Sequence, residues 1–137
     1  ARSTSSPSLT FCSPDILKFA DLILLRAECR ANLGLTTAVD DLDRVRARAE
    51  LSGYDGLTDK ESLRQEVFNE RRRELFGEGQ FYFDIVRNRY HKKYLRGNFQ
   101  TLTEQDIING AFYAPVGIGA FEKNTLMTQN TYWQWQK

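Results

Sequence analysis

The stretch ERRREL, residues 70–75, brings carboxylates and guanidinium groups together in a helix-like pattern. Glu70 and Glu74 stand one helical turn apart, a spacing that could serve a general acid and a general base. The same spacing suits ion pairs with Arg71, Arg72 and Arg73, either on one helix surface or between helices. Because no histidine or nucleophile accompanies the two carboxylates in this stretch, we favour the ion-pair interpretation.

A pair of glycines in the string GEGQ, Gly77 and Gly79, follows directly. A glycine-rich phosphate loop must follow a strand and open a helix, and no strand pattern precedes Gly77. The two glycines therefore predict a left-handed turn and a close helix crossing, with no phosphate site.

A basic run, RNRYHKKYLR at residues 87–96, interleaves tyrosines with cations as an RNA-stacking surface would. The whole chain balances 19 Lys and Arg against 18 Asp and Glu, so it exerts no strong overall attraction on a polyanion. We therefore expect a solvated helix face and no nucleic-acid partner. His91, the sole histidine, is expected on that surface, because Arg89, Lys92 and Lys93 disfavour its cation and any bound metal.

The tail YWQWQ supplies two candidate ligand-binding residues, Trp133 and Trp135. Flat aromatic rings stack on sugar faces, and they also close hydrophobic cores with one polar edge exposed; we favour the second use here. The sequence contains no HExxH, GxSxG or CxxC pair and no aspartate-rich calcium loop. It therefore predicts no catalytic residue, no metal site and no cofactor.

Helix signals outnumber strand alternation along the chain. Ser13 before a proline predicts the start of a first helix, and Gly34 predicts its end. Residues at three-to-four spacing, including Phe19 and Ile23, are expected on its inner face, which Leu22 widens.

Three further helices are predicted after Gly34. Thr37 in TAVD and Thr58 in TDKE each open a predicted capping box, for a second and a third helix. Gly77 is expected to end the third helix. A fourth should run from about residue 80 through residue 95, with Phe81 and Ile85 facing inward.

Two helical hairpins in succession, at roughly the period of a tetratricopeptide array, make the predicted fold all-α. We expect a single domain or fragment over residues 1–137. Residues 1–13 would be a flexible lead-in, and residues 14–96 the tetratricopeptide-like helical hairpins. Residues 97–137, rich in Asn, Gln, Thr and Gly, would form an irregular closing segment with short helices.

Four sequence blocks follow one another along the chain: FADLILLRAE, DDLDRVRARAEL, ERRREL and FGEGQFYFDIVR. In this order they resemble the C-terminal part of the SusD/RagB family of nutrient-uptake outer-membrane lipoproteins. The last two are similar to the family's ERR-x-EL and FEG-x-R-W/Y-F-D-L-V-R motifs, and the first two resemble two upstream helices. The residues that carry the central motif are Glu70, Arg71, Arg72, Glu74, Gly77, Gly79, Phe83, Asp84 and Arg87. The closing pattern is matched by Pro115, Glu122, Asn124, Leu126, Gln129 and Asn130, with departures at Asp43, Thr125 and Thr131.

The resemblance implies a non-enzymatic, surface-exposed, lipid-anchored protein of the bacterial outer membrane. Such a protein captures a glycan or another nutrient and delivers it to a TonB-dependent, SusC-like transporter. Members of the family are several times as long, and their sugar contacts come mostly from other segments. This chain would then supply helical scaffold, meet oligosaccharide through the full-length protein, and by itself bind it weakly or not at all; the lipid anchor would lie outside it. The alternative, supported by the hairpin pattern only, is a stand-alone helical-repeat adaptor for a protein partner.

Overall fold

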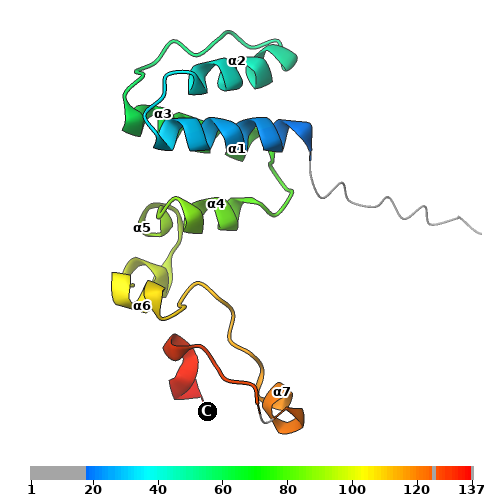
Figure 1. The fold of residues 1–137 in the computed structure, drawn as a ribbon, viewed down its shortest axis with the longest axis vertical. Helices are drawn as coiled ribbons and strands as arrows, with labels where there is room; N and C mark the ends of the chain where they lie inside the picture. Colours follow the sequence, from blue (N-terminus) through cyan, green and yellow to red (C-terminus); the bar gives the residue numbers. More distant parts are fainter. Residues whose placement is uncertain (1–17, 125, 137) are drawn as a thin grey trace, which may run out of the picture. The chain divides into compact units, whose positions relative to one another are not determined.

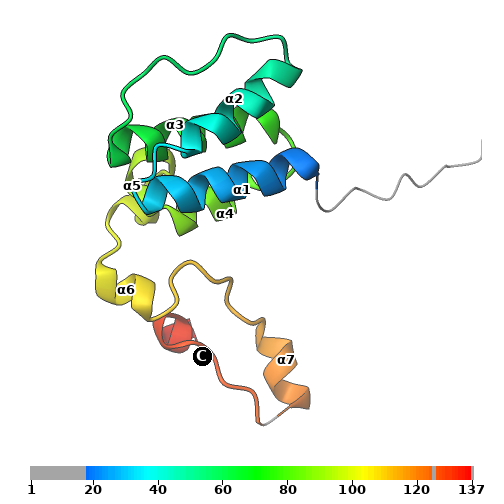
Figure 2. The same cartoon turned by 45° about the horizontal axis from the view of Figure 1, so that its top comes forward.

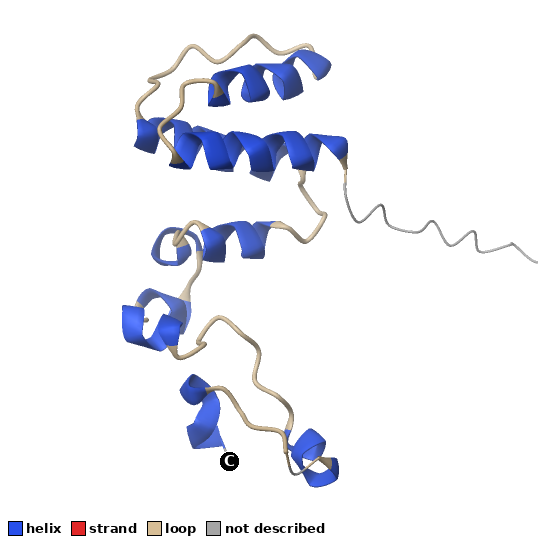
Figure 3. Ribbon diagram, viewed as in Figure 1, coloured by secondary structure: helices blue, strands red, loops and turns tan. Residues whose placement is uncertain are grey.

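The computed structural model describes residues 18–124 and 126–136, and every regular element within them is a helix (Figure 3). The chain divides into two compact units between Glu78 and Gly79. The all-α prediction is confirmed. The tetratricopeptide-like pairing of the third and fourth helices stays a prediction, because these two helices belong to different units. None of the described helices is long and apolar enough to cross a bilayer.

The first unit is built from three helices, α1 (Phe19–Asn32), α2 (Ala38–Arg48) and α3 (Lys60–Glu74). α1 packs against both of the others, and the chain reverses direction between α1 and α2, as the predicted hairpin requires (Figures 1 and 2). The shared core consists of Ile23, Leu24, Ala27, Ala31, Ala38, Leu42, Val45, Leu63 and Val67.

The inner face of α1 differs from the predicted one at two positions. Ile23 is buried as expected, but the side chains of Phe19 and Leu22 are 66% and 50% exposed. The buried face carries Asp21 and Glu28 in their place. Hydrophobic periodicity assigned the face wrongly because these two acids have a buried cationic partner on α3, described below.

The helix ends agree only in part with their sequence signals. Gly34, at φ +73°, ends α1 as predicted, and the Leu35 N–H donates to the Arg30 carbonyl at 2.9 Å. The capping box at Thr37 is wrong, since its side chain accepts no bond from α2. That at Thr58 is displaced by one residue, because the Asp59 carboxylate accepts the Glu61 and Ser62 N–H groups, each at 3.1 Å. The predicted start at Ser13 lies outside the described residues.

The second unit contains α4 (Phe81–Arg87), α5 (His91–Tyr94), the 3-10 helix η1 (Gly97–Gln100), α6 (Glu104–Ile108), α7 (Ile118–Lys123) and the 3-10 helix η2 (Thr131–Gln136). Leu102, Ile107 and Ala111 form its small core, against which Phe99, Phe112 and Tyr132 pack. From residue 97 onward, the short helices separated by loops match the irregular closing segment predicted for residues 97–137.

The predicted fourth helix through residue 95 is wrong in extent. It ends at Arg87, and the chain turns through Arg89 before α5 begins. The Asn88 amide donates to the Asp84 carbonyl at 3.1 Å, which stabilises the helix end. Of the two residues expected to face inward, Ile85 is fully buried and Phe81 is 38% exposed.

Candidate functional site

Arg71 is the largest fully buried side chain in the described part of the chain, with 1% of its surface exposed. Its Nη1 donates to Asp21 Oδ1 at 2.7 Å and to the Asp21 carbonyl at 3.3 Å. Its Nε lies 3.9 Å from Glu28 Oε2. Because both acids belong to α1, the guanidinium ties α3 to α1 inside the core, where charge-assisted hydrogen bonds are strong.

Glu70 and Glu74, the candidate acid–base pair, bind arginines and face α2. Glu70 Oε2 accepts from Arg73 Nη2 at 2.6 Å and lies 3.4 Å from Arg46 Nη1. Glu74 Oε1 accepts from Arg48 Nη2 at 2.5 Å. The ion-pair interpretation of these residues is thereby confirmed, and α2 supplies two of the cations.

A third set of ion pairs joins α1 to α2. The Asp41 carboxylate is 2% exposed and accepts from Arg26 Nη2 at 2.6 Å and from Arg30 Nη1 at 2.9 Å. Arg30 also donates to the Thr37 carbonyl at 3.1 Å. All three helices of the unit are therefore held by arginine–carboxylate pairs in addition to the apolar core.

The turn after α3 contains both motif glycines. Gly77 and Gly79 each have φ +80°, the left-handed conformation that glycine adopts without a Cβ penalty. The Glu78 N–H donates to the Leu75 carbonyl at 3.1 Å, and the Glu78 carboxylate pairs with Lys18. A helix precedes the turn, so it is not a phosphate loop. The exposed Arg72 lies before it on α3.

The second half of the motif stabilises α4 itself. Asp84 is 2% exposed, and its Oδ1 accepts from Arg87 Nη2 at 2.7 Å, as the spacing of three predicts. Phe83 is 62% exposed and meets the Tyr82 ring edge to face. The Tyr82 hydroxyl donates to the Phe112 carbonyl at 2.9 Å, so this part of the aromatic run contacts the segment after α6.

His91 is buried, with 3% of its surface exposed, and its predicted place on the solvated surface is wrong. The turn before α5 directs it inward, edge-on against the Phe112 ring at 5.2 Å between centroids. Neither ring nitrogen has a hydrogen-bond partner in the described structure. Burial lowers the pKa of His91, and the nearby Lys92 and Arg89 lower it further. The described residues also contain no cluster of three or more His, Cys, Asp or Glu that could hold a metal ion.

Trp133 lines a pocket of about 220 Å³ in the second unit, and its polar edge is already engaged. The indole Nε1 donates to the Tyr113 carbonyl at 2.8 Å, and the ring meets Tyr132 edge to face at 4.9 Å. Beside it, the Gln129 amide pairs with both the N–H and the carbonyl of Val116, each at 3.1 Å. These contacts fit the core-closing interpretation of Trp133. The side chain of Trp135 lies outside what the structure describes.

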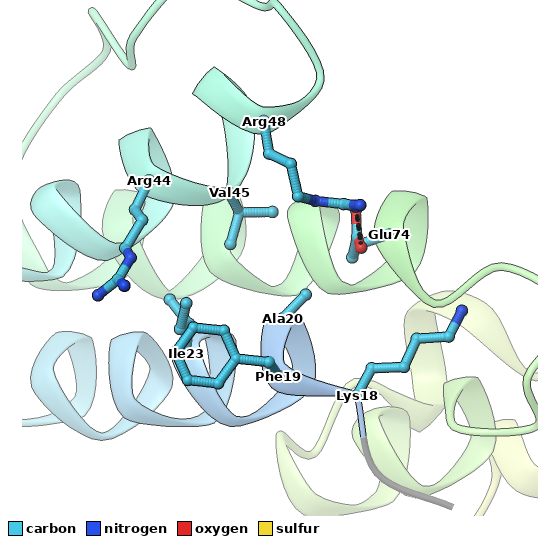
Figure 4. Close-up of a pocket in the computed structure, with 8 residues that line it drawn as sticks. All are labelled: Lys18, Phe19, Ala20, Ile23, Arg44, Val45, Arg48 and Glu74. Carbon is cyan, nitrogen blue, oxygen red and sulfur yellow. Dashed lines mark hydrogen bonds and ion pairs between the residues drawn. The ribbon is translucent and has the colours of Figure 1, made fainter. Parts of the chain in front are cut away.

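The first unit has an open groove of about 380 Å³ between α1, α2 and α3 (Figure 4). Its apolar lining consists of Phe19, Ala20, Ile23 and Val45, and its polar lining of Lys18, Arg44, Arg48 and Glu74. The Arg44 guanidinium lies 5.4 Å from the centre of the Phe19 ring, a cation–π contact. The groove offers room for an apolar group, and two of its charged residues, Arg48 and Glu74, are engaged with each other.

Sequence reasoning missed Asp21 and Glu28 as the partners of Arg71, and Tyr113 as the partner of Trp133. The two acids stand seven positions apart, which places them two turns apart on one helical face. That spacing on an otherwise apolar face was a signal that a buried arginine of another helix binds both acids. No sequence signal pointed to Tyr113, because Trp133 donates to its backbone carbonyl, a group that every residue type has.

Comparison with known proteins gives consistent matches. The model of the SusD family matches residues 5–133. A SusD-like protein of Formosa agariphila is 30% identical over 112 residues, which cover 75% of this chain and 22% of that protein. Two crystal structures from Bacteroides thetaiotaomicron, a SusD homolog and a SusD superfamily protein, each superpose with a TM-score of 0.71 over 87% of this chain, at 33% and 35% identity. The chain spans 25% and 26% of those two solved chains.

Proposed function

Because the chain belongs to the SusD family, we propose that it is part of a protein that captures a glycan or another nutrient. That protein delivers its cargo, without catalysing a reaction, to a TonB-dependent transporter of the SusC type. Glycan binding in nutrient uptake is what membership of the family implies. This chain contributes helical scaffold, and oligosaccharide is bound through the full-length protein.

The use of the motif residues supports a scaffold role. Four charged residues of the central motif with little exposed surface are engaged in ion pairs, either between helices or within one helix. They are Glu70, Arg71, Glu74 and Asp84. Groups committed to such pairs are unavailable for a substrate, and removing them would cost stability. The single observation that carries the proposal is this engagement of a family motif in packing.

The family also supports a surface-exposed location on the bacterial outer membrane, through a lipid anchor outside this chain. The upstream coding sequence tests this directly. A signal peptide ending in a lipidated cysteine, followed by several hundred residues, supports uptake. A start codon adjacent to Ala1 would instead favour the stand-alone adaptor.

The adaptor alternative has one favourable observation, the groove of Figure 4. Its apolar floor and exposed Phe19 could receive an apolar side chain of a protein partner. Copurification separates the two functions. The full-length protein should bring down an outer-membrane transporter, whereas an adaptor would retain a partner through the groove and lose it on Phe19→Ala.

Binding assays on two polypeptides test the scaffold proposal. The full-length protein and this chain are compared by calorimetry or affinity electrophoresis against plant, host and microbial glycans. The full-length protein should bind at least one of them, and this chain should bind weakly or not at all, because one or two stacking contacts of order 1 kcal/mol do not offset the cost of association. Micromolar binding by this chain that Trp133→Ala or Trp135→Ala abolishes would overturn the division of roles.

A further inference from the structure

A second pocket in the same unit as Trp133 combines arginine with aromatic rings. It has a volume of about 230 Å³ and lies at the end of α4, beside α6 and the segment that follows α6. Its lining residues are Val86, Arg87, Arg89, Ile107, Phe112 and Tyr113. Arg89 and Tyr113 are exposed, so the pocket is open to a ligand on the side where these two residues lie.

The two arginines of this pocket differ in their partners. Arg87 binds the buried carboxylate of Asp84 at 2.7 Å. Arg89 has no ion pair with a carboxylate anywhere in the described residues. The next residues with charge, Lys92 and Lys93, are also cations. The pocket therefore presents an uncompensated positive charge, which favours an anionic ligand.

The backbone at Arg89 shows that the turn after α4 does not depend on the arginine side chain. After α4 the Arg89 N–H donates to the Val86 carbonyl at 3.2 Å, and the Tyr90 N–H to the Ile85 carbonyl at 2.9 Å. This is a Schellman motif, and it places Arg89 in the left-handed conformation with φ +61°. Glycine is the favoured residue there, as at Gly34 after α1. The fold therefore does not require an arginine side chain at this position, and glycine can replace it without disturbing the turn.

The aromatic rings of the pocket are carried by a backbone that two side chains hold in place. The Tyr82 hydroxyl donates to the Phe112 carbonyl at 2.9 Å, and the Trp133 indole donates to the next carbonyl, that of Tyr113, at 2.8 Å. The buried His91 ring packs against Phe112. The Tyr113 side chain is 72% exposed, so its hydroxyl can serve a ligand. Such a backbone pre-organises the two rings for binding.

From the uncompensated Arg89 beside two held aromatic rings, we propose that this pocket binds the carboxylate-bearing ring of an acidic sugar, a uronate. The guanidinium fork matches a planar carboxylate, and a tyrosine or phenylalanine face packs on the apolar face of a pyranose ring. This inference rests on the proposed function, since glycan capture supplies the sugar, and it narrows the cargo to uronate-containing glycans. One open pocket gives millimolar affinity, in agreement with the weak binding expected of this chain alone.

The test is a titration of the chain with galacturonate, followed by the amide NMR signals of Arg89, Phe112 and Tyr113. Galactose is the matched neutral ring, and acetate is the matched free carboxylate. Galacturonate should shift these signals saturably, with an affinity about fivefold or more above that of either control, as the loss of one exposed charge-assisted contact implies. Absence of a saturable shift, or an equal response to galactose or acetate, would overturn the proposal.

Two glycine variants separate binding from folding. Arg89→Gly should weaken galacturonate binding about fivefold while leaving the unfolding temperature unchanged or higher, because glycine suits the left-handed backbone. Glu50→Gly is the matched control, since Glu50 occupies the same position after α2 with φ +57°; it should leave galacturonate binding unchanged. Unaltered binding by Arg89→Gly would refute the assignment. If the full-length protein captures neutral glycans while this chain shows no specific binding of galacturonate, the uronate assignment of the pocket is overturned and the proposed function stands.

Discussion

Replacing Asp21 by Asn should destabilise the first unit by about 3 kcal/mol, the low end of the cost of breaking a buried ion pair. Asn keeps the size of the side chain and removes its charge. The Arg71 guanidinium, 1% exposed, would then lose the carboxylate that lies 2.7 Å away. Glu28, at 3.9 Å from Arg71 Nε, compensates the charge only in part.

The assay is thermal and urea unfolding followed by circular dichroism. For a unit of this size a loss of about 3 kcal/mol lowers the midpoint by roughly 10 to 20 °C. Arg71→Met should cost a similar amount, because it leaves Asp21 and Glu28 as buried carboxylates. The double variant should cost at least about 2 kcal/mol less than the sum, since each single change already breaks the same pair.

An ion pair in the same unit whose cation is exposed, with a carboxylate that keeps 14% of its side-chain surface exposed, provides the control. Arg48 and Glu74 lie 2.5 Å apart, and the Arg48 side chain is 67% exposed. Arg48→Met should therefore cost below about 1 kcal/mol, and high salt should reduce that cost further. A loss below about 1 kcal/mol for Asp21→Asn, or additive losses in the double variant, would refute the reasoning.

Three further predictions concern the second unit. Asp84→Ala should lower stability by roughly 1 to 3 kcal/mol, because it removes the buried carboxylate and with it the ion pair to Arg87. A thermal shift within noise would count against this prediction. His91 has a folded pKa below its ordinary value of 6.5, so the unfolded chain takes up its proton first. Stability should then fall as pH drops below about 6.5 and level off below the folded pKa, and His91→Phe should abolish this dependence in urea titrations at several pH values. Trp133→Phe should cost about 1 kcal/mol by removing the indole donor to the Tyr113 carbonyl; an unchanged urea midpoint would show that this hydrogen bond adds nothing.

The sequence by itself determined the features that depend on neighbours within a turn or two. The helical class and the end of α1 at Gly34 were predicted correctly, and the pairing of Asp84 with Arg87 follows from their spacing on one helix. Each depends on contacts between residues no more than a few positions apart, such as a left-handed glycine or a spacing of three on one helix. Motif order was also sufficient to recognise the family, since the order of residue types survives without coordinates.

Only the tertiary structure decided which charged residues are buried and what they bind. Arg71 meets Asp21 across 50 positions of sequence, and its burial turned the inner face of α1 towards the acids and left Phe19 exposed. His91 reads as a surface residue among cations, yet the turn at Arg89 directs it against Phe112, 21 positions later. Local propensity contains no information on such partners, because a buried charge is stable only when a distant segment supplies its counter-charge and excludes water.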